Sequence, residues 1–162
     1  MNLLKLFRMQ RALDEYIETE HGLQEADLFD KKVLALLVEI GELANETRCF
    51  KFWSLKQPSE RKFILEEFVD GVHFILSLGL TCSLEQEAVI AEAEAAGSVT
   101  EQFLHVYEAV HVFKREKSAD TYQQLLQNYF TLGRLLGFSA EEVEGAYVAK
   151  NEVNYERQQQ GY

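Results

Sequence analysis

Apolar side chains recur every three or four positions along most of the chain, the spacing that places them on one face of an α-helix. This pattern predicts helices at about 2–20, 28–48, 58–81, 99–116, 118–136 and 139–158, and a further helical stretch near 85–96. The period-two alternation typical of strands is absent, and one proline and nine glycines are few helix breakers for this length. Ser139 and Glu142 have the spacing of a capping box at the start of the last helix. We therefore expect an all-α protein.

The length and composition indicate one globular domain over residues 1–162. A chain of 162 residues falls within the ~100–200 residues of a usual domain. Hydrophobic residues make up 47% and charged residues 27%, a balance that supports a packed core. Residues 81–113 contain six glutamates and no lysine or arginine. We interpret this part as a solvated, acidic helical insert at about 83–117.

The net charge, the hydropathy pattern and the cysteines disfavour several classes of partner and location. With 16 Lys and Arg against 27 Asp and Glu, the formal charge is −11, which disfavours binding to nucleic acid or to anionic lipid. No apolar run reaches the ~20 residues of a membrane span, and the first residues lack the features of a secretory signal. Cys49 and Cys82 fit neither a metal pattern nor a disulfide framework. We expect no nucleic-acid or membrane partner and a cytoplasmic location.

Acidic side chains interrupt two very apolar predicted helices. In the second helix, Glu39, Glu42 and Glu46 fall within about 60° of one another at 100° per residue. For this helix alone, a face exposed to water explains the stripe as well as a functional carboxylate site does. In the third helix, Glu67 and Asp70 are three residues apart and share their face with phenylalanine and leucine side chains, which a solvated face does not normally carry.

Buried carboxylates are costly unless they are paired with a cation, so the two pairs favour a shared metal site over structural ion pairs. Four oxygen ligands, Glu39, Glu42, Glu67 and Asp70, without histidine or cysteine among them suit Mg²⁺ or Mn²⁺ better than zinc. Structural ion pairs are the alternative at this point.

The same residues resemble a known family. Glu39-x-x-Glu42 followed, after a gap of 24 residues, by Glu67-x-x-Asp70 resembles the signature of the all-α, MazG-like nucleoside triphosphate pyrophosphatases. Longer strings resemble the dimeric dUTPase family, namely those at 39–46, 50–54, 66–74 and 150–158. The resemblance covers about residues 3–80 and 139–162 and leaves the acidic middle unmatched.

This resemblance implies a helical bundle with a four-helix metal-binding core, active as a homodimer. It implies Mg²⁺-dependent cleavage of dUTP to dUMP and pyrophosphate, with Glu39, Glu42, Glu67 and Asp70 as metal ligands. A carboxylate not fully occupied by metal, Glu42 or Glu46, would accept the proton of the attacking water. The catalytic set is then Glu39, Glu42 and Glu46.

Candidate substrate contacts interrupt other apolar faces. Gln10 lies on an apolar seam of the first helix with Asp14 one turn later, and a glutamine amide can both donate to and accept from a uracil edge. The resemblance supports this base contact, whereas a bond to a neighbouring helix and a solvated Asp14 are the alternatives. Trp53 either closes over the base or packs as satellite core, and His73 either touches the sugar or is a core histidine.

The last predicted helix carries amides and cations on one face. Spacings of three and four residues place six side chains on this face, namely Tyr147, Lys150, Asn151, Asn154, Arg157 and Gln158, and the cations and amides among them suit a grip on a triphosphate. A plain solvated helix is the alternative.

Two other functions remain open from the sequence. A related all-α pyrophosphatase acting on dCTP or non-standard nucleotides would use the same carboxylates with different base contacts. A non-catalytic helical dimerisation or adaptor module would carry them only as surface charge. Base preference, the number of metal ions, the general base and the role of the acidic middle stay open.

Overall fold

The structure, a computed structural model, describes residues 1–90 and 97–161. Within these residues the regular structure is entirely helical, which confirms the all-α prediction. The helices are α1 (Leu3–Glu20), α2 (Phe29–Thr47), α3 (Arg61–Thr81), α4 (Val99–Glu116), α5 (Ala119–Leu135) and α6 (Ala140–Gln159). Ser139 caps α6 together with Glu142, so the predicted capping box is confirmed.

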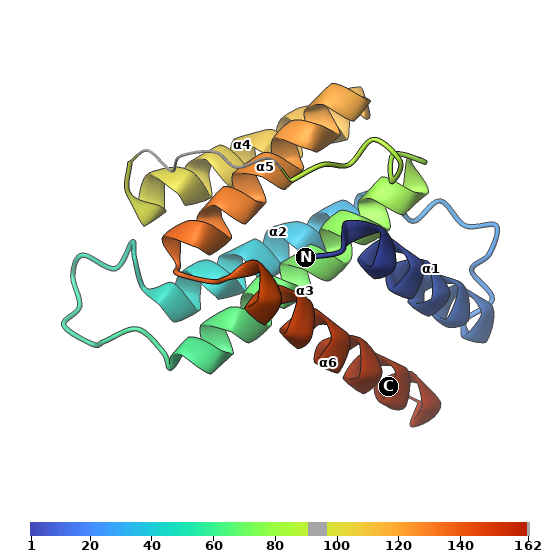
Figure 1. The fold of residues 1–162 in the computed structure, drawn as a ribbon, viewed down its shortest axis with the longest axis horizontal. Helices are drawn as coiled ribbons and strands as arrows, with labels where there is room; N and C mark the ends of the chain where they lie inside the picture. The colour runs from blue at the N-terminus through green and yellow to red at the C-terminus, as the bar shows by residue number, and fades with distance from the viewer. Residues whose placement is uncertain (91–96, 162) are drawn as a thin grey trace.

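Two pairs of helices cover opposite sides of a central helix pair (Figure 1). Helices α2 and α3 pack on each other, α4 and α5 pack together on one side of them, and α1 and α6 lie on the other side. Helix α3 contacts α1, α2, α5 and α6, so it is buried on nearly every face. Its long apolar run is the sequence counterpart of that central position.

A glycine lets α5 approach α3 closely. A Cβ added at Gly71 would lie 1.9 Å from the hydroxyl oxygen of Tyr129. That hydroxyl donates to the backbone carbonyl of Phe68 at 2.8 Å, which satisfies the buried phenol. Gly79 and Tyr122 repeat the arrangement further along α3.

The predicted helical stretch near 85–96 is wrong for residues 85–90, which are not helical; residues 91–96 lie outside the described residues. Ser83 adopts a left-handed φ of 58° after α3 and turns the chain away from the helix direction. The backbone of Val89 is then bound on both its N–H and its carbonyl by the side chain of Gln123. These backbone groups are therefore not available for helical hydrogen bonds.

The acidic segment is not wholly solvated as expected. Its helix α4 packs on α2 and α5 and buries one face, formed by Gln102, Phe103, Val106, Ala109, Val110 and Phe113. The glutamates Glu101 and Glu108 lie exposed on the helix. Helix α4 is thus amphipathic, and its apolar face belongs to the core.

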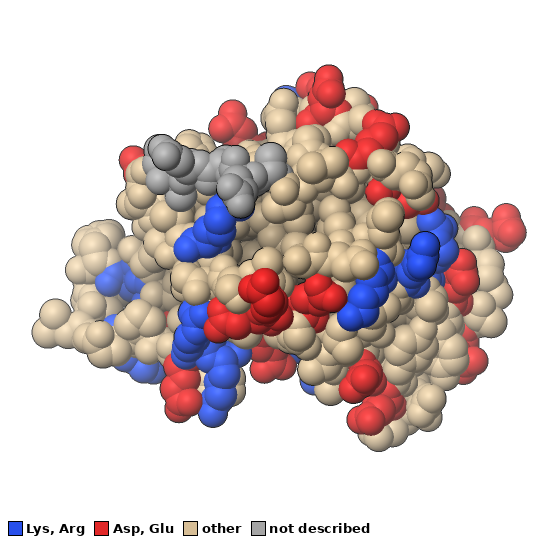
Figure 2. Space-filling model, in the orientation of Figure 1, with Lys and Arg blue, Asp and Glu red and all other residues tan. Residues whose placement is uncertain are grey.

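On the face drawn in Figure 2, acidic side chains lie among basic ones, so the net charge of −11 is not gathered in one area of that face. None of the helices in the described ranges combines the length and the apolarity needed to cross a bilayer.

Candidate active site

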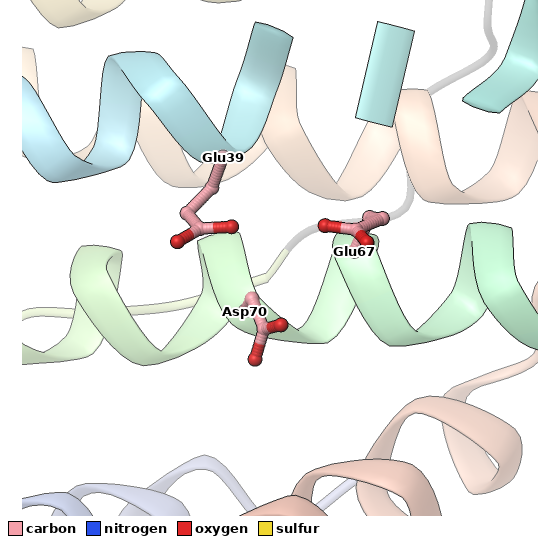
Figure 3. A group of neighbouring side chains, drawn as sticks. All are labelled: Glu39, Glu67 and Asp70. Carbon is pink, nitrogen blue, oxygen red and sulfur yellow. The ribbon is translucent and has the colours of Figure 1, made fainter. Parts of the chain in front are cut away.

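A cluster of three carboxylates lies between α2 and α3. Glu39 extends from α2 toward α3, where Glu67 and Asp70 lie one helical turn apart (Figure 3). One oxygen from each side chain lies within 4.8 Å of the other two, and all three side chains are half-buried. The structure therefore brings together carboxylates from both predicted acidic pairs.

The electrostatics of this cluster are unfavourable without a cation. Burial, followed by the negative charges of Asp70, Glu42 and Glu67, raises the pKa of Glu39 to about 7. Burial and the neighbouring carboxylates raise the pKa of Glu67 to about 6. Burial also raises the pKa of Asp70, although Lys150 acts in the opposite direction. An all-oxygen donor set with such mutual repulsion fits a hard divalent cation.

Two predicted carboxylates lie outside this set of three. Glu42 is exposed, yet its charge contributes to the raised pKa values of Glu39 and Glu67. Glu46 is half-buried one turn further along α2, where its backbone carbonyl accepts a hydrogen bond from Ser59. Only three of the four predicted ligands thus share one compact set.

Helix α6 supplies a cation to the same place. The ammonium of Lys150 lies 2.8 Å from Oδ2 of Asp70 and 2.8 Å from Oε1 of Glu66. Burial by itself lowers the pKa of Lys150, but its bonds to Asp70 and Glu66 leave that pKa above its ordinary value. Without metal, Lys150 partly neutralises the acidic cluster.

A cavity of about 360 Å³ connects this cluster with α1. The predicted site residues that line it are Gln10, Asp14, Glu39, Asp70, His73, Lys150, Asn154 and Arg157. They come from α1, α2, α3 and α6, so residues far apart in the sequence meet in one pocket. A larger cavity of about 540 Å³ around Phe130 and Phe138 is mostly apolar and is lined by none of the carboxylates, so the chemistry favours the smaller one.

At the end of the pocket away from the carboxylate cluster, polar side chains are joined by hydrogen bonds. Gln10 is buried and bonds to Asp14, His73 and Tyr147 at 2.7–2.8 Å. The rings of His73 and Tyr147 stack with centroids 4.1 Å apart. Ser77 donates to Asp14 at 2.6 Å. Gln10 and His73 are therefore held by the protein before any ligand binds.

Several predicted contacts do not line this pocket. Trp53 is 65% exposed in the connection between α2 and α3, edge-on to Phe50 and Phe52. Asn151 is buried beside Tyr147, and its Nδ2 has no hydrogen-bond partner among the described residues. Glu67 belongs to the carboxylate cluster but is not part of the pocket lining.

Sequence reasoning missed three polar residues near the site, Lys32, Glu66 and Ser77, because single polar residues are common in amphipathic helices. Tyr147 was expected on the polar face of the last helix, but its hydrogen bond to Gln10 was not foreseen.

Comparison with known proteins agrees with this geometry. The sequence model of a family described as dUTPase matches residues 2–162, which includes the acidic middle segment. Among curated proteins, no sequence matches the chain. The family match spans the whole chain, and the fold is all-helical as in that family. The chain therefore belongs to the all-α dUTPase family and is a hydrolase that acts on dUTP.

Proposed function

We propose that the chain cleaves dUTP to dUMP and pyrophosphate with Mg²⁺, or Mn²⁺ in its place, held by Glu39, Glu67 and Asp70. The observation that carries this proposal is the half-buried set of three carboxylates with raised pKa values at one end of the pocket. Glu42, exposed beside the set, is proposed as a further ligand when the cation binds. A structural ion-pair role is disfavoured because the positive charges of Lys150 and Arg157, which act to lower the pKa of Asp70, still leave the pKa values of Glu39 and Glu67 raised.

A divalent cation bound here would neutralise part of the negative charge of the phosphates and lower the pKa of the attacking water. Lys150, Asn154 and Arg157 line the pocket from α6 and are assigned to the phosphate chain. Asn151 of the same helix is buried and does not line the pocket, so it is assigned no direct contact with the phosphates. The proton acceptor must be a carboxylate that the cation does not fully occupy. We assign this role to Glu42, which is exposed and lies at the edge of the ligand set, so that one of its oxygens stays free of the cation. Glu46, one turn further on, is the alternative acceptor.

At the other end of the pocket we assign Gln10 and His73 to the nucleoside. Both side chains line the cavity and are fixed by hydrogen bonds to the protein. Asp14 also lines the cavity, but both of its oxygens already accept hydrogen bonds from the protein, so we assign it to hold Gln10 rather than to contact the nucleoside. Trp53 does not line the pocket, which favours a role at an interface over a contact with the base.

We propose that the chain works as a homodimer. Large apolar side chains are exposed on α2, on α4 and in the connection after α2, namely Leu34, Val38, Leu104, Phe52, Trp53 and Leu55. Phe52 is 92% and Leu55 98% exposed, and exposed apolar groups of this kind are typical of contact surfaces between subunits. Sedimentation equilibrium tests the assembly, and a monomer at micromolar concentration would refute it.

A cytoplasmic location is also proposed. Cys49 and Cys82 are free thiols, as is usual in a reducing compartment. Cell fractionation tests this, and recovery of the protein outside the cytoplasm would refute it.

A panel of nucleotides tests the proposed activity. Pyrophosphate release from dUTP, dCTP, dTTP and UTP is measured with Mg²⁺ and again after EDTA. We expect dUTP to be cleaved fastest, activity to disappear with EDTA, and excess Mg²⁺ to restore it. Faster cleavage of dCTP would favour the related pyrophosphatase. No cleavage, with no Mg²⁺-dependent thermal stabilisation by a non-hydrolysable dUTP analogue, would favour an adaptor module.

A further inference from the structure

A chain of hydrogen bonds runs from Asp14 through Gln10 to His73 at the nucleoside end of the pocket. Oδ1 of Asp14 accepts from Nε2 of Gln10 at 2.8 Å. Oδ2 of Asp14 accepts from the Ser77 hydroxyl at 2.6 Å and lies 3.6 Å from the ammonium of Lys32. Asp14 is thus a charged group held at both oxygens.

The negative charge of Asp14 decides which atom donates and which accepts in each of these hydrogen bonds. An ionised carboxylate only accepts hydrogen bonds, so the Gln10 atom that faces it must be the amide nitrogen. The amide oxygen of Gln10 is then on the opposite side, where it accepts from the Tyr147 hydroxyl at 2.7 Å. It also accepts from Nδ1 of His73 at 2.8 Å, so the Nδ1 atom must carry a proton.

This order of donors and acceptors decides whether Nε2 of His73 donates a hydrogen bond to a ligand or accepts one. Burial lowers the pKa of His73 to about 3, so the ring is neutral and carries a single proton. With that proton on Nδ1, the Nε2 atom is a bare acceptor. His73 lines the pocket but is only 5% exposed. Its Nε2 atom is buried and has no hydrogen-bond partner among the described residues. A buried acceptor of this kind requires a donor.

We propose that Asp14 is a positioning residue, which acts through Gln10 to fix the tautomer of His73 so that Nε2 accepts an N–H or O–H of the nucleoside. The sequence suggested that Gln10 both donates to and accepts from the base, but its oxygen is already occupied by Tyr147 and His73. Gln10 is left with one N–H to offer. The inference rests on the proposed function in one respect, that the nucleoside occupies this end of the pocket.

The first test reads the tautomer directly and needs no substrate. Two-bond ¹H–¹⁵N correlation spectra of the metal-free wild-type protein should show His73 protonated at Nδ1 and unprotonated at Nε2. In Asp14→Asn, the positive charge of Lys32 favours the amide oxygen of the new side chain on its side, so that the amide NH₂ faces Gln10. The Gln10 amide must then turn over, so that its oxygen accepts from this NH₂ and its own NH₂ faces Nδ1 of His73. We expect the Nε2-protonated form to appear in this variant.

Tyr147→Phe is the matched control. It removes one bond to the same Gln10 oxygen but leaves Asp14 in place, so the His73 tautomer should stay as in the wild type. A wild-type protein with its proton on Nε2, or a folded Asp14→Asn protein with an unchanged tautomer, would overturn the proposal. The wild-type spectrum still tests the predicted tautomer if the variant does not fold, and a proton on Nε2 there overturns the proposal.

The second test identifies the donor on the nucleoside. N3-methyl-dUTP lacks the imino N–H, and 2′,3′-dideoxyuridine triphosphate lacks the sugar hydroxyl. Wild-type kcat/KM should fall about tenfold or more for the analogue that lacks the donor, and this penalty should shrink in Asp14→Asn. Equal penalties in both proteins would overturn the positioning role. Failure of wild-type protein to cleave dUTP would refute the proposed function and leave the tautomer result standing.

Discussion

Replacing Glu39 with glutamine should stabilise the metal-free protein at alkaline pH and remove its stabilisation by Mg²⁺. In the folded protein the pKa of Glu39 is about 7, against 4.5 for an unperturbed glutamate. The folded state therefore binds this proton more tightly than the unfolded chain does. The resulting stabilisation is fully present below about pH 4.5 and is lost as the pH rises through about 7.

The size of this effect follows from the pKa difference. Each pH unit corresponds to ~1.36 kcal/mol, so the ionised Glu39 destabilises the folded state by about 3 kcal/mol before solvent screening. The side chain is only half-buried, and screening reduces the figure to roughly 1–2 kcal/mol. For a chain of this length, that corresponds to a rise in Tm of roughly 3–6 °C in Glu39→Gln at pH 8.

Thermal unfolding followed by circular dichroism measures the effect at pH 5 and pH 8, with EDTA or with Mg²⁺. With EDTA, Glu39→Gln should melt higher than wild type at pH 8, and most of the difference should vanish at pH 5, where Glu39 is protonated. Mg²⁺ should raise the Tm of the wild type but not of the variant. Glu108→Gln, an exposed change on α4, serves as the control. A lower Tm for Glu39→Gln in EDTA at pH 8 would refute the reasoning.

Three other substitutions test separate parts of the structure. Lys150→Gln removes the ammonium that contacts Asp70, and kcat/KM for dUTP should fall by about 10- to 100-fold in steady-state assays; an unchanged value would remove Lys150 from the phosphate site. Gln10→Leu leaves buried partners unpaired, so urea unfolding should show a loss of about 1–3 kcal/mol together with a higher KM, and full stability would contradict the hydrogen bonds described. Gly71→Ala places a Cβ 1.9 Å from the Tyr129 hydroxyl oxygen and should cost about 1–3 kcal/mol in the same measurement, whereas a neutral result would show that α5 can shift.

The sequence by itself determined the helices and which side chains share a helix face. Both depend on local periodicity, because a helix places residues three or four apart on the same side wherever it packs. The pairing of Glu67 with Asp70 and the capping of α6 by Ser139 were therefore predictable. The stretch at 85–90 was not, because a tertiary contact from Gln123 holds its backbone in a non-helical form.

Only the tertiary structure decided which of these faces meet. Distances between helices depend on packing and on the path of the connections, and neither follows from spacing along the chain. Packing therefore placed Glu39 with Asp70 and left Glu42 outside the set of three. It also brought Lys150 to Asp70 and occupied the oxygen of Gln10, because the partners of a buried polar group come from whichever helices pack beside it.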